Sequence, residues 1–273
     1  MCQIIINLIG FNNDMKHIIL ILFFASIFVL TSFTKLELKE YRLKTIVIDA
    51  GHGGKDPGCK GKKSLEANIA LKVALELGKI INDNLAEIKV IYTRDSDKFV
   101  ELHDRARLAN KNNAHLFISI HCNAGPSSIY GTETYTMGLH TSEKNLEVAQ
   151  RENSVILKEE NYLEKYDGFD PNSPTAYILF ANFQNAYLKN SLSFAQKVET
   201  QFETLVGRKS RGVLQAGFLV LWKTTMPSVL IEIGYLTNSN EEKFLGKRMG
   251  QNYIASGIYN ALKEYKEELE SMN

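Results

Sequence analysis

The stretch TIVIDAGHGG, residues 45–54, is a short run of β-branched and apolar side chains that ends in a glycine-rich turn. Such a run predicts a buried β-strand that delivers a loop. Residues 64–82 follow with apolar side chains at helical spacing, and Ser64 is the expected N-cap of this helix. The next predicted elements are strands at 88–93 and 115–121, with a helix at 101–112 between them. This alternation predicts an α/β fold in which neighbouring strands run parallel.

The second half of the chain continues the predicted sheet after a polar interruption. Strands are expected at 130–137, 212–222 and 227–235, helices at 141–165, 176–206 and 249–268, and a loop at 166–175. We therefore expect a single domain over residues 44–268, with a central, mostly parallel, twisted sheet flanked by helices. Residues 141–190 are longer than a link from strand to helix needs, so they predict a helical insertion. Residues 269–273 are expected to form a tail.

The first segment of the chain differs from the rest. Residues 18–33 carry no charge, and basic residues stand on both sides of them. This pattern predicts a secretory leader over residues 1–34, followed by a linker over 35–43. Because the apolar run is close to membrane-spanning length, an uncleaved anchor is the alternative.

Composition excludes several classes of protein. The chain has 273 residues, of which 44% are hydrophobic and 23% are charged, as is ordinary for a globular protein. The formal net charge is +1 and the lysines are scattered, so we expect no nucleic-acid partner, and contact with a membrane only through an uncleaved leader. Cys2 lies in the predicted leader segment, before its apolar run, which leaves Cys59 and Cys122, too few for a disulfide framework.

Three side chains with metal-binding chemistry fall where an α/β sheet gathers its ligands. His52 follows a predicted strand, Glu66 lies near a helix start and His121 ends a strand. Two imidazoles and one carboxylate are a known ligand set for catalytic Zn²⁺, whose fourth position is open to water. Glu232 lies in an otherwise apolar strand, where a carboxylate is costly unless it is paired or functional, so it is the candidate base.

Each of these residues also has a plainer interpretation. His52 beside glycines could be a turn residue, and Glu66 could be a first-turn carboxylate favoured by the helix dipole. His121 could be a hydrogen-bonded core histidine, and Glu232 could point outward from its strand. His103 lacks a comparable position and is expected at the surface or in packing. The case for a site rests on the joint position of the four residues.

Several long motifs occur in one order along most of the chain. They are TIVIDAGHGGKDPGCKG at 45–61, LEANIAL at 65–71, YTRDSDKFVELHDRARLAN at 92–110, FISIHCNA at 117–124, GVLQAGFLVL at 212–221 and MPSVLIEIGYLTNSNEE at 226–242. From about Lys44 to Tyr265 the chain thus resembles the zinc-dependent N-acetylmuramoyl-L-alanine amidases of type 3, used in bacterial cell separation. The resemblance implies hydrolysis of the amide that joins N-acetylmuramic acid to L-alanine in peptidoglycan, for cell-wall remodelling and daughter-cell separation.

The resemblance also implies roles for individual residues. His52, Glu66 and His121 match the family's zinc ligands, with one Zn²⁺ per active site. Glu232 matches the catalytic glutamate, which takes a proton from the attacking water and returns it to the leaving amine.

Other residues in the same motifs receive weaker assignments. Asn123 and Gln215 are implied to bind substrate, although Asn123 could equally be a turn residue. For Arg105 we prefer a structural salt bridge. Cys122 adjoins a predicted ligand, but strand alternation predicts that its side chain points away from His121.

The insertion at 141–190 suggests control. Some family members that this chain resembles carry a helix here that blocks the zinc until a partner displaces it. Residues 148–166 could form such a helix, and Glu152, Glu159 or Glu160 could supply the blocking carboxylate. The plainer alternative is a solvated helix with ordinary Glu–Lys pairs. The implied partners are peptidoglycan and a protein activator.

Two other functions remain open from the sequence. A zinc peptidase or deacetylase acting on the same polymer would use similar ligands, and a wall-binding or activator module without catalysis would have lost one of the four site residues. All four are present. For an enzyme of the cell wall we expect export, to the periplasm or, with an uncleaved leader, to the outer face of the inner membrane.

Overall fold

The computed structural model describes residues 17–18, 42–140, 142–181 and 186–271, with only the backbone described for 178–181. The chain divides into two units, Met1–Glu40 with Asn273, and Tyr41–Met272. Apart from residues 17–18, the predicted leader lies outside the described residues, as does most of the linker. Within the described part of the chain, no helix combines the length and the apolar character that crossing a membrane requires.

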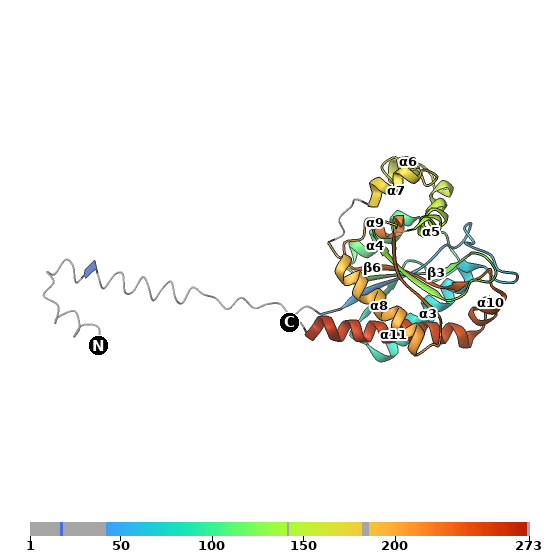
Figure 1. The fold of residues 1–273 in the computed structure, drawn as a ribbon. Helices are drawn as coiled ribbons and strands as arrows, with labels where there is room; N and C mark the ends of the chain where they lie inside the picture. Colours follow the sequence, from blue (N-terminus) through green and yellow to red (C-terminus); the bar gives the residue numbers. More distant parts are fainter. Residues whose placement is uncertain (1–16, 19–41, 141, 182–185, 272–273) are drawn as a thin grey trace. The chain divides into compact units, whose positions relative to one another are not determined.

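The second unit alternates strands and helices (Figure 1). In chain order its elements are β1 (Thr45–Ala50), α3 (Glu66–Asn84), β2 (Lys89–Tyr92), α4 (Leu102–Lys111), β3 (Leu116–Asn123), β4 (Thr132–Met137), α5 (Glu143–Asn153), the 3-10 helix η1 (Ser154–Lys158), α6 (Tyr162–Lys165), α7 (Pro174–Ala181), α8 (Leu188–Thr204), β5 (Ser210–Ala216), α9 (Leu219–Trp222), β6 (Ser228–Tyr235), α10 (Ser239–Leu245) and α11 (Arg248–Ser271).

The strands form one six-stranded sheet in the order β2-β1-β3-β6-β4-β5. Every neighbouring pair is parallel except β4 with β6, which is antiparallel. The prediction of a single α/β domain with a mostly parallel sheet is therefore confirmed. Helices α3, α8 and α11 pack together on one face, and α4 and α9 lie on the other. Figure 1 shows α6 and α7 at the top of the folded unit, with α5 below them; all three belong to the predicted insertion.

Strand alternation divides the apolar side chains between two cores and collects polar side chains on one face. On β3, Ile120 and Cys122 enter the core beneath α3 and α11, whereas Phe117 enters the core beneath α4. His121 and Asn123, between and beyond these residues, therefore face the α4 side. The prediction that Cys122 points away from His121 is confirmed.

Some predicted boundaries were wrong. Ser64 is not the N-cap, because it lies in a turn in which Gly61 N donates to its carbonyl and its own N donates to Glu242; α3 begins at Glu66 behind an uncapped Leu65. The expected strand 212–222 ends at Ala216 and is followed by helix α9. The residues of α9 are apolar and all but Trp222 are buried, and such a short run does not distinguish strand from helix.

The insertion is also divided more finely than predicted. The segment expected as a helix at 141–165 consists of α5, η1 and α6, and the one expected at 176–206 consists of α7 and α8. Helix α7 begins at Pro174, inside the predicted loop, since a proline is well tolerated in the first turn of a helix.

A buried ion pair holds the end of β1. Asp49 accepts hydrogen bonds from Arg105 Nη1 at 2.8 Å and from the hydroxyls of Thr93 and Ser119 at 2.6 Å each. Burial alone would raise the pKa of Asp49, but Arg105 and the two hydroxyls outweigh burial and lower it. Arg105 also donates to the carbonyls of Ala50 and His52, so it fixes the loop that follows the strand. These contacts match the structural role preferred for Arg105.

We expect Asp49→Asn to lower the free energy of unfolding by about 3–5 kcal/mol, because it leaves the buried Arg105 guanidinium without its counter-charge. Urea unfolding followed by circular dichroism measures the change. Asp83→Asn, which removes the exposed partner of Lys79 on α3, serves as the control and should leave the urea midpoint unchanged. A similar midpoint for both variants would contradict this account of the Asp49 pair.

Candidate metal centre and active site

Four side chains from four separate segments converge above the carboxyl ends of β1 and β3. His52, Glu66, His121 and Glu152 are all buried, and their ligand atoms lie within 4.8 Å of one another. The Glu66 Oε1 atom is 3.0 Å from His52 Nε2 and 3.1 Å from His121 Nδ1. The Glu152 Oε2 atom is 3.0 Å from each of the same two nitrogens. The structure thus brings together the three residues predicted as metal ligands and one of the three predicted to block the metal.

Glu66 is fixed by the backbone at both oxygens. Its Oε2 accepts from Cys59 N and its Oε1 from Cys122 N, each at 2.8 Å. The carboxylate therefore ties the loop after β1 to strand β3. Gly58 permits this approach, because it has a φ of +67° and a Cβ there would lie 2.5 Å from Glu66 Oε2.

His52 lies in the loop after β1 with an unusual backbone conformation. Its φ is +59°, a left-handed value that non-glycine residues seldom adopt. The preceding Gly51 must lack a side chain, since a Cβ there would lie 2.5 Å from the His121 ring. Asp56 Oδ2 lies 2.7 Å from His52 Nδ1. This contact favours the tautomer in which Nδ1 carries the proton and Nε2 faces the cluster as a free ligand atom.

The donor set fits a divalent cation. His52 Nε2 and Glu152 Oε2 are buried in the centre of the group, 3.0 Å apart, and neither makes a hydrogen bond of good geometry. Donor separations near 3 Å approach the roughly 3.4 Å expected between neighbouring ligands of a tetrahedral zinc ion. Burial lowers the pKa of His121, but the Glu152 and Glu66 carboxylates outweigh burial and raise it to about 9. The same site electrostatics that favour protons on the imidazoles favour a cation between them.

Glu232 lies beside this group on strand β6. The sheet register pairs His121 with Glu232, and the side chain is fully buried. Its Oε2 atom has no hydrogen-bond partner. Burial, followed by repulsion from Glu152, raises the pKa of Glu232 well above its usual range, although the charge of Arg151 opposes the rise. A buried carboxylate with a raised pKa can both accept and return a proton near neutral pH.

Arg151, beside Glu152 on α5, contacts the other side of the site. Its Nε donates to Glu152 Oε1 at 2.9 Å. Its Nη2 donates to Asn123 Oδ1 at 3.0 Å and lies 3.4 Å from Glu232 Oε1. Asn123, predicted to bind substrate, is thus within the site, where it touches the insertion.

The insertion is fastened around the site by further polar contacts. Lys158 Nζ, at the end of η1, donates to Asp56 Oδ1 at 2.7 Å. Glu159 does not reach the cluster: it accepts from Leu102 N at 3.0 Å and from the Tyr166 hydroxyl at 2.8 Å, and so holds the insertion to the start of α4. Glu160 is exposed. Of the three carboxylates proposed to block the metal, only Glu152 is in position.

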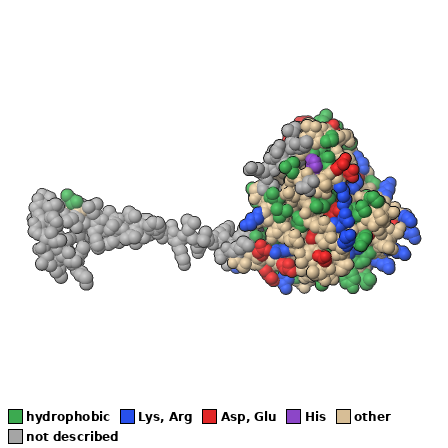
Figure 2. Space-filling view, in the orientation of Figure 1, with side chains coloured by type: hydrophobic (Ala, Val, Ile, Leu, Met, Phe, Trp, Pro, Cys, Tyr) green, Lys and Arg blue, Asp and Glu red, His purple; other side chains and the backbone are tan. Residues whose placement is uncertain are grey.

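A second group of possible metal ligands takes part in the polar contacts that hold the insertion to α4. Glu101, His103 and Glu159 could together hold a cation, but Lys165 Nζ already lies 2.6 Å from Glu101 Oε2. His103 also donates its backbone N–H to the Tyr166 hydroxyl at 3.0 Å. These contacts agree with the packing role expected for His103. Figure 2 shows Lys and Arg side chains gathered along one face of the folded unit, with acidic side chains close by.

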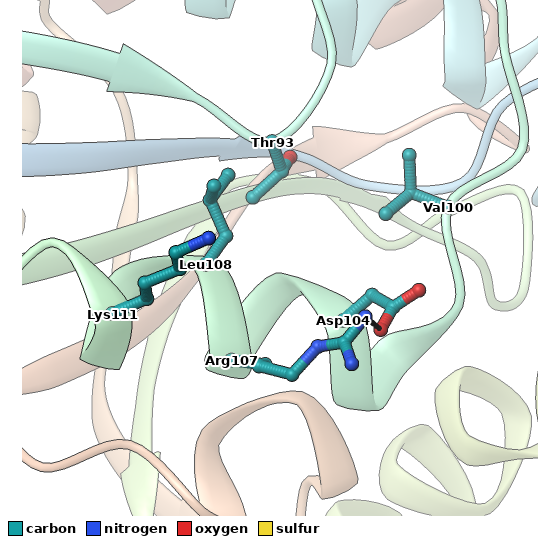
Figure 3. Close-up of a pocket in the computed structure, with 6 residues that line it drawn as sticks. All are labelled: Thr93, Val100, Asp104, Arg107, Leu108 and Lys111. Carbon is teal, nitrogen blue, oxygen red and sulfur yellow. Dashed lines mark ion pairs between the residues drawn. The ribbon is translucent and has the colours of Figure 1, made fainter.

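Two features lie apart from the cluster. Gln215, predicted to bind substrate, stands between Leu214 and Ala216, which pack on the α4 side, so its side chain points to the opposite face. Its role stays a prediction that no described contact supports. The hollow in Figure 3 contains no cluster residue, and an Asp104–Arg107 ion pair of 2.7 Å joins two of its lining residues. The hollow is lined by Thr93, Val100, Asp104, Arg107, Leu108 and Lys111.

Sequence reasoning missed several residues of the site. Asp56 had a weak signal, because it follows His52 by four positions in the same glycine-rich loop. Arg151 and Glu133 carried no sequence signal beyond their proximity to motifs. Arg94 lies within a motif, but the sequence analysis assigned it no role. Arg94 is buried and donates to the carbonyls of Ala50, Gly51 and Ala67, so it fixes the backbone around His52.

Comparison with known proteins agrees with this geometry. The family profile described as N-acetylmuramoyl-L-alanine amidase (Amidase_3) matches residues 46–264, most of the chain. This chain belongs to the type 3 N-acetylmuramoyl-L-alanine amidases. It is an enzyme that hydrolyses peptidoglycan at an amide bond. Membership sets aside the peptidase, deacetylase and non-catalytic alternatives.

Individual relatives cover nearly all of the amidase domain. A putative N-acetylmuramoyl-L-alanine amidase of Buchnera aphidicola subsp. Acyrthosiphon pisum is 32% identical over 227 residues, which cover 81% of this chain and 94% of that protein. The crystal structure of N-acetylmuramoyl-L-alanine amidase from Clostridium difficile 630 has a TM-score of 0.62 and 27% identity, and covers 82% of this chain and 97% of that one. The CwlD amidase from Clostridioides difficile, solved in complex with the GerS lipoprotein, has a TM-score of 0.60 and 25% identity, and covers 81% of this chain and 98% of that one.

We expect Asp56→Asn to weaken Zn²⁺ binding about 10- to 100-fold, because an amide orients and polarises the His52 ring less well than a carboxylate. Competition with a chromophoric chelator measures the affinity without any need for turnover. Asp95→Asn, on an exposed loop, is the matched control and should bind like the unaltered chain. Equal affinities for all three proteins would show that Asp56 does not support a ligand.

Proposed function

We propose that this amidase is zinc-dependent and cleaves the bond between the lactyl carbonyl of N-acetylmuramic acid and the nitrogen of L-alanine. The observation that carries the proposal is the convergence of His52, Glu66 and His121 beside Glu232. In this assignment the first three residues hold the ion. A bound zinc ion supplies a Lewis acid for the carbonyl and lowers the pKa of water to about 7.

Glu232 is the proposed proton carrier. Strand β6 holds it next to His121. Its Oε2 atom makes no hydrogen bond with another residue, so that oxygen is available to accept a proton. The group would take the proton of the attacking water and deliver it to the departing nitrogen. Burial and repulsion from Glu152 raise the pKa of Glu232, and Arg151, on the same helix as Glu152, opposes the rise.

Digestion of purified peptidoglycan tests the assignment. The Glu152→Ala chain, in which the proposed blocking carboxylate is absent, should liberate stem peptides with free L-alanine amino termini from intact glycan, detected by mass spectrometry, and a chelator should abolish the reaction. Glu232→Gln should keep one zinc per chain and lose about 10²–10⁴-fold in kcat, since general-base catalysis contributes about that much. Glu203→Gln, exposed on α8, is the control. Normal turnover by Glu232→Gln would refute its role.

The second part of the proposal is that the insertion holds the enzyme inactive. Glu152 Oε2 lies 3.0 Å from His52 Nε2 and from His121 Nδ1, so it would fill the fourth position, which water and the substrate carbonyl need. Arg151 meanwhile neutralises Glu232 and covers Asn123. A protein partner would displace α5 and expose the site. The CwlD–GerS complex is a precedent for an amidase of this family with a protein partner.

Glu152→Ala should raise basal wall digestion at least tenfold in the absence of any partner, because the fourth position of the cluster then opens to water and substrate. Release of dye-labelled fragments from purified wall measures the rate. Glu147→Ala, exposed on the same helix, is the matched control and should stay at the basal rate. Substitution is preferable to removal of residues 148–174, because Val148, Ile156 and Tyr166 belong to the core. An unchanged basal rate in a folded Glu152→Ala protein would contradict inhibition by this residue.

We further propose that the enzyme acts after export, in the periplasm or at the outer face of the inner membrane, during wall remodelling and daughter-cell separation. Peptidoglycan lies outside the cytoplasm, and the predicted leader supplies a route. A relative of 31% identity over 226 residues is named a probable cell wall amidase.

A further inference from the structure

Three hydrogen-bond acceptors lie around the Arg151 guanidinium at the edge of the site. They are Asn123 Oδ1, the Ala124 carbonyl and Glu232 Oε1, and the Arg151 guanidinium contacts them at 3.0, 3.4 and 3.4 Å. The acceptors come from the end of β3 and from β6, whereas Arg151 comes from the insertion. The site therefore has an acceptor-lined side that a cation from the insertion now fills.

The acceptor side is held in place without Arg151. The Asn123 side chain is fully buried, its Nδ2 donates to Glu133 Oε2 at 2.9 Å, and its Oδ1 accepts from Ala124 N at 2.8 Å. An ionised Glu133 accepts only, so the amide must present its nitrogen to Glu133 and its oxygen to the site. Burial would raise the pKa of Glu133, but hydrogen bonds led by Lys144 and Tyr235 outweigh burial and lower it.

Glu133 is itself fixed from several directions. The hydroxyls of Tyr235 and Tyr135 donate to it at 2.7 and 2.9 Å, and Arg211 Nε donates at 2.8 Å. Strand β4, which runs antiparallel to β6, places Glu133 directly opposite Glu232 in the register. Lys144, on α5, also donates to Glu133 and would leave with the insertion. Tyr135, Tyr235 and Arg211 lie on strands of the sheet, so they keep Glu133, and through it the Asn123 amide, in place when the insertion moves away.

Amide hydrolysis creates charges that match the two sides of the site. The oxygen of water bonds to the lactyl carbon, the carbon–nitrogen bond breaks, and the nitrogen takes a proton through Glu232. The carboxylic acid then loses a proton and the amine gains one, which gives a carboxylate and an ammonium. An α-amino group with a pKa of about 7.7–8.0 is mostly protonated at neutral pH. Glu152 and Arg151 present the same pair of charges, a carboxylate and a cation, side by side.

We propose that Asn123 Oδ1, the Ala124 carbonyl and Glu232 Oε1 form the subsite for the amino group of L-alanine, and that Arg151 inhibits the enzyme by occupying it. The inference rests on the proposed amidase function and adds the substrate group that these three acceptors recognise. Before cleavage the same acceptors receive the N–H of the scissile amide, which directs the leaving nitrogen toward Glu232. The insertion then mimics both reaction products: Arg151 takes the place of the L-alanine ammonium group, and Glu152 takes the place of the lactyl carboxylate.

Binding of a product fragment tests the subsite without turnover. The probe is the dipeptide L-alanyl-γ-D-glutamate, which holds the released amino group but no lactyl amide, titrated calorimetrically into the full-length, zinc-supplied chain. Arg151→Ala should bind it at least tenfold more tightly than the unaltered chain, because the acceptors are then free. Acetylation of the dipeptide's amino group should abolish this gain. Arg107→Ala, an exposed arginine on α4, is the matched control and should bind like the unaltered chain.

A second variant tests the acceptors themselves. Asn123→Leu added to Arg151→Ala should return the affinity to that of the unaltered chain, with thermal unfolding used to check that the protein is folded. The proposal is overturned if Arg151→Ala binds the acetylated dipeptide as tightly as the free one, or if it gains no affinity at all. Either result could occur while Glu152→Ala still digests wall, so loss of the subsite and loss of the amidase assignment are distinguishable.

Discussion

Burial of the Glu66 carboxylate is the constraint on which the site depends. A fully buried charge is tolerated only with partners, and the partners of Glu66 are backbone N–H groups from two distant segments, at Cys59 and Cys122. The loop after β1 and the end of β3 must therefore meet wherever Glu66 is buried. This meeting brings the rings of His52 and His121 to 4.9 Å between centroids. The grouping of these side chains thus follows from the way in which the first residue of α3, Glu66, is buried against the sheet.

Two buried arginines complete the frame from the opposite side. Arg94 and Arg105 both donate to the Ala50 carbonyl, and between them they also hold the carbonyls of Gly51 and His52. Loop carbonyls at this depth would otherwise lose their hydrogen bonds to water. The left-handed conformation of His52 is therefore held by polar contacts on both sides, and the ring remains directed at the cluster even though the backbone conformation is unfavourable by itself.

Much of the architecture could be predicted from the sequence because periodic apolar patterns report local geometry. The strand–helix alternation, the position of His52 and His121 at strand ends, and the direction of Cys122 all follow from such patterns. The antiparallel pairing of β4 with β6 could not be predicted in this way, because pairing between strands that are distant in sequence leaves no local pattern. For the same reason the sequence offered Glu152, Glu159 and Glu160 as equals: only the bend between α5 and η1, fixed by the packing of Val155 and Ile156, decides which of them reaches the histidines. Asp56, Arg94 and Glu133 support other residues rather than forming a motif of their own.

The insertion shares its apolar core with the rest of the domain, and this has a mechanical consequence for opening. Val148 and Ala149 of α5 and Ile156 of η1 pack in the same cluster as Tyr135 and Leu230 of the sheet. Moving α5 away from the sheet would expose these apolar side chains to water. The exposure costs a free energy of about 25 cal/mol for each Å² of apolar surface. A partner that bound only through charges would not offset this free energy. A partner with an apolar groove would offset it, because the groove would bury the apolar face of α5 again. In the proposed activation, α5 would therefore exchange its packing against its own domain for packing against another protein.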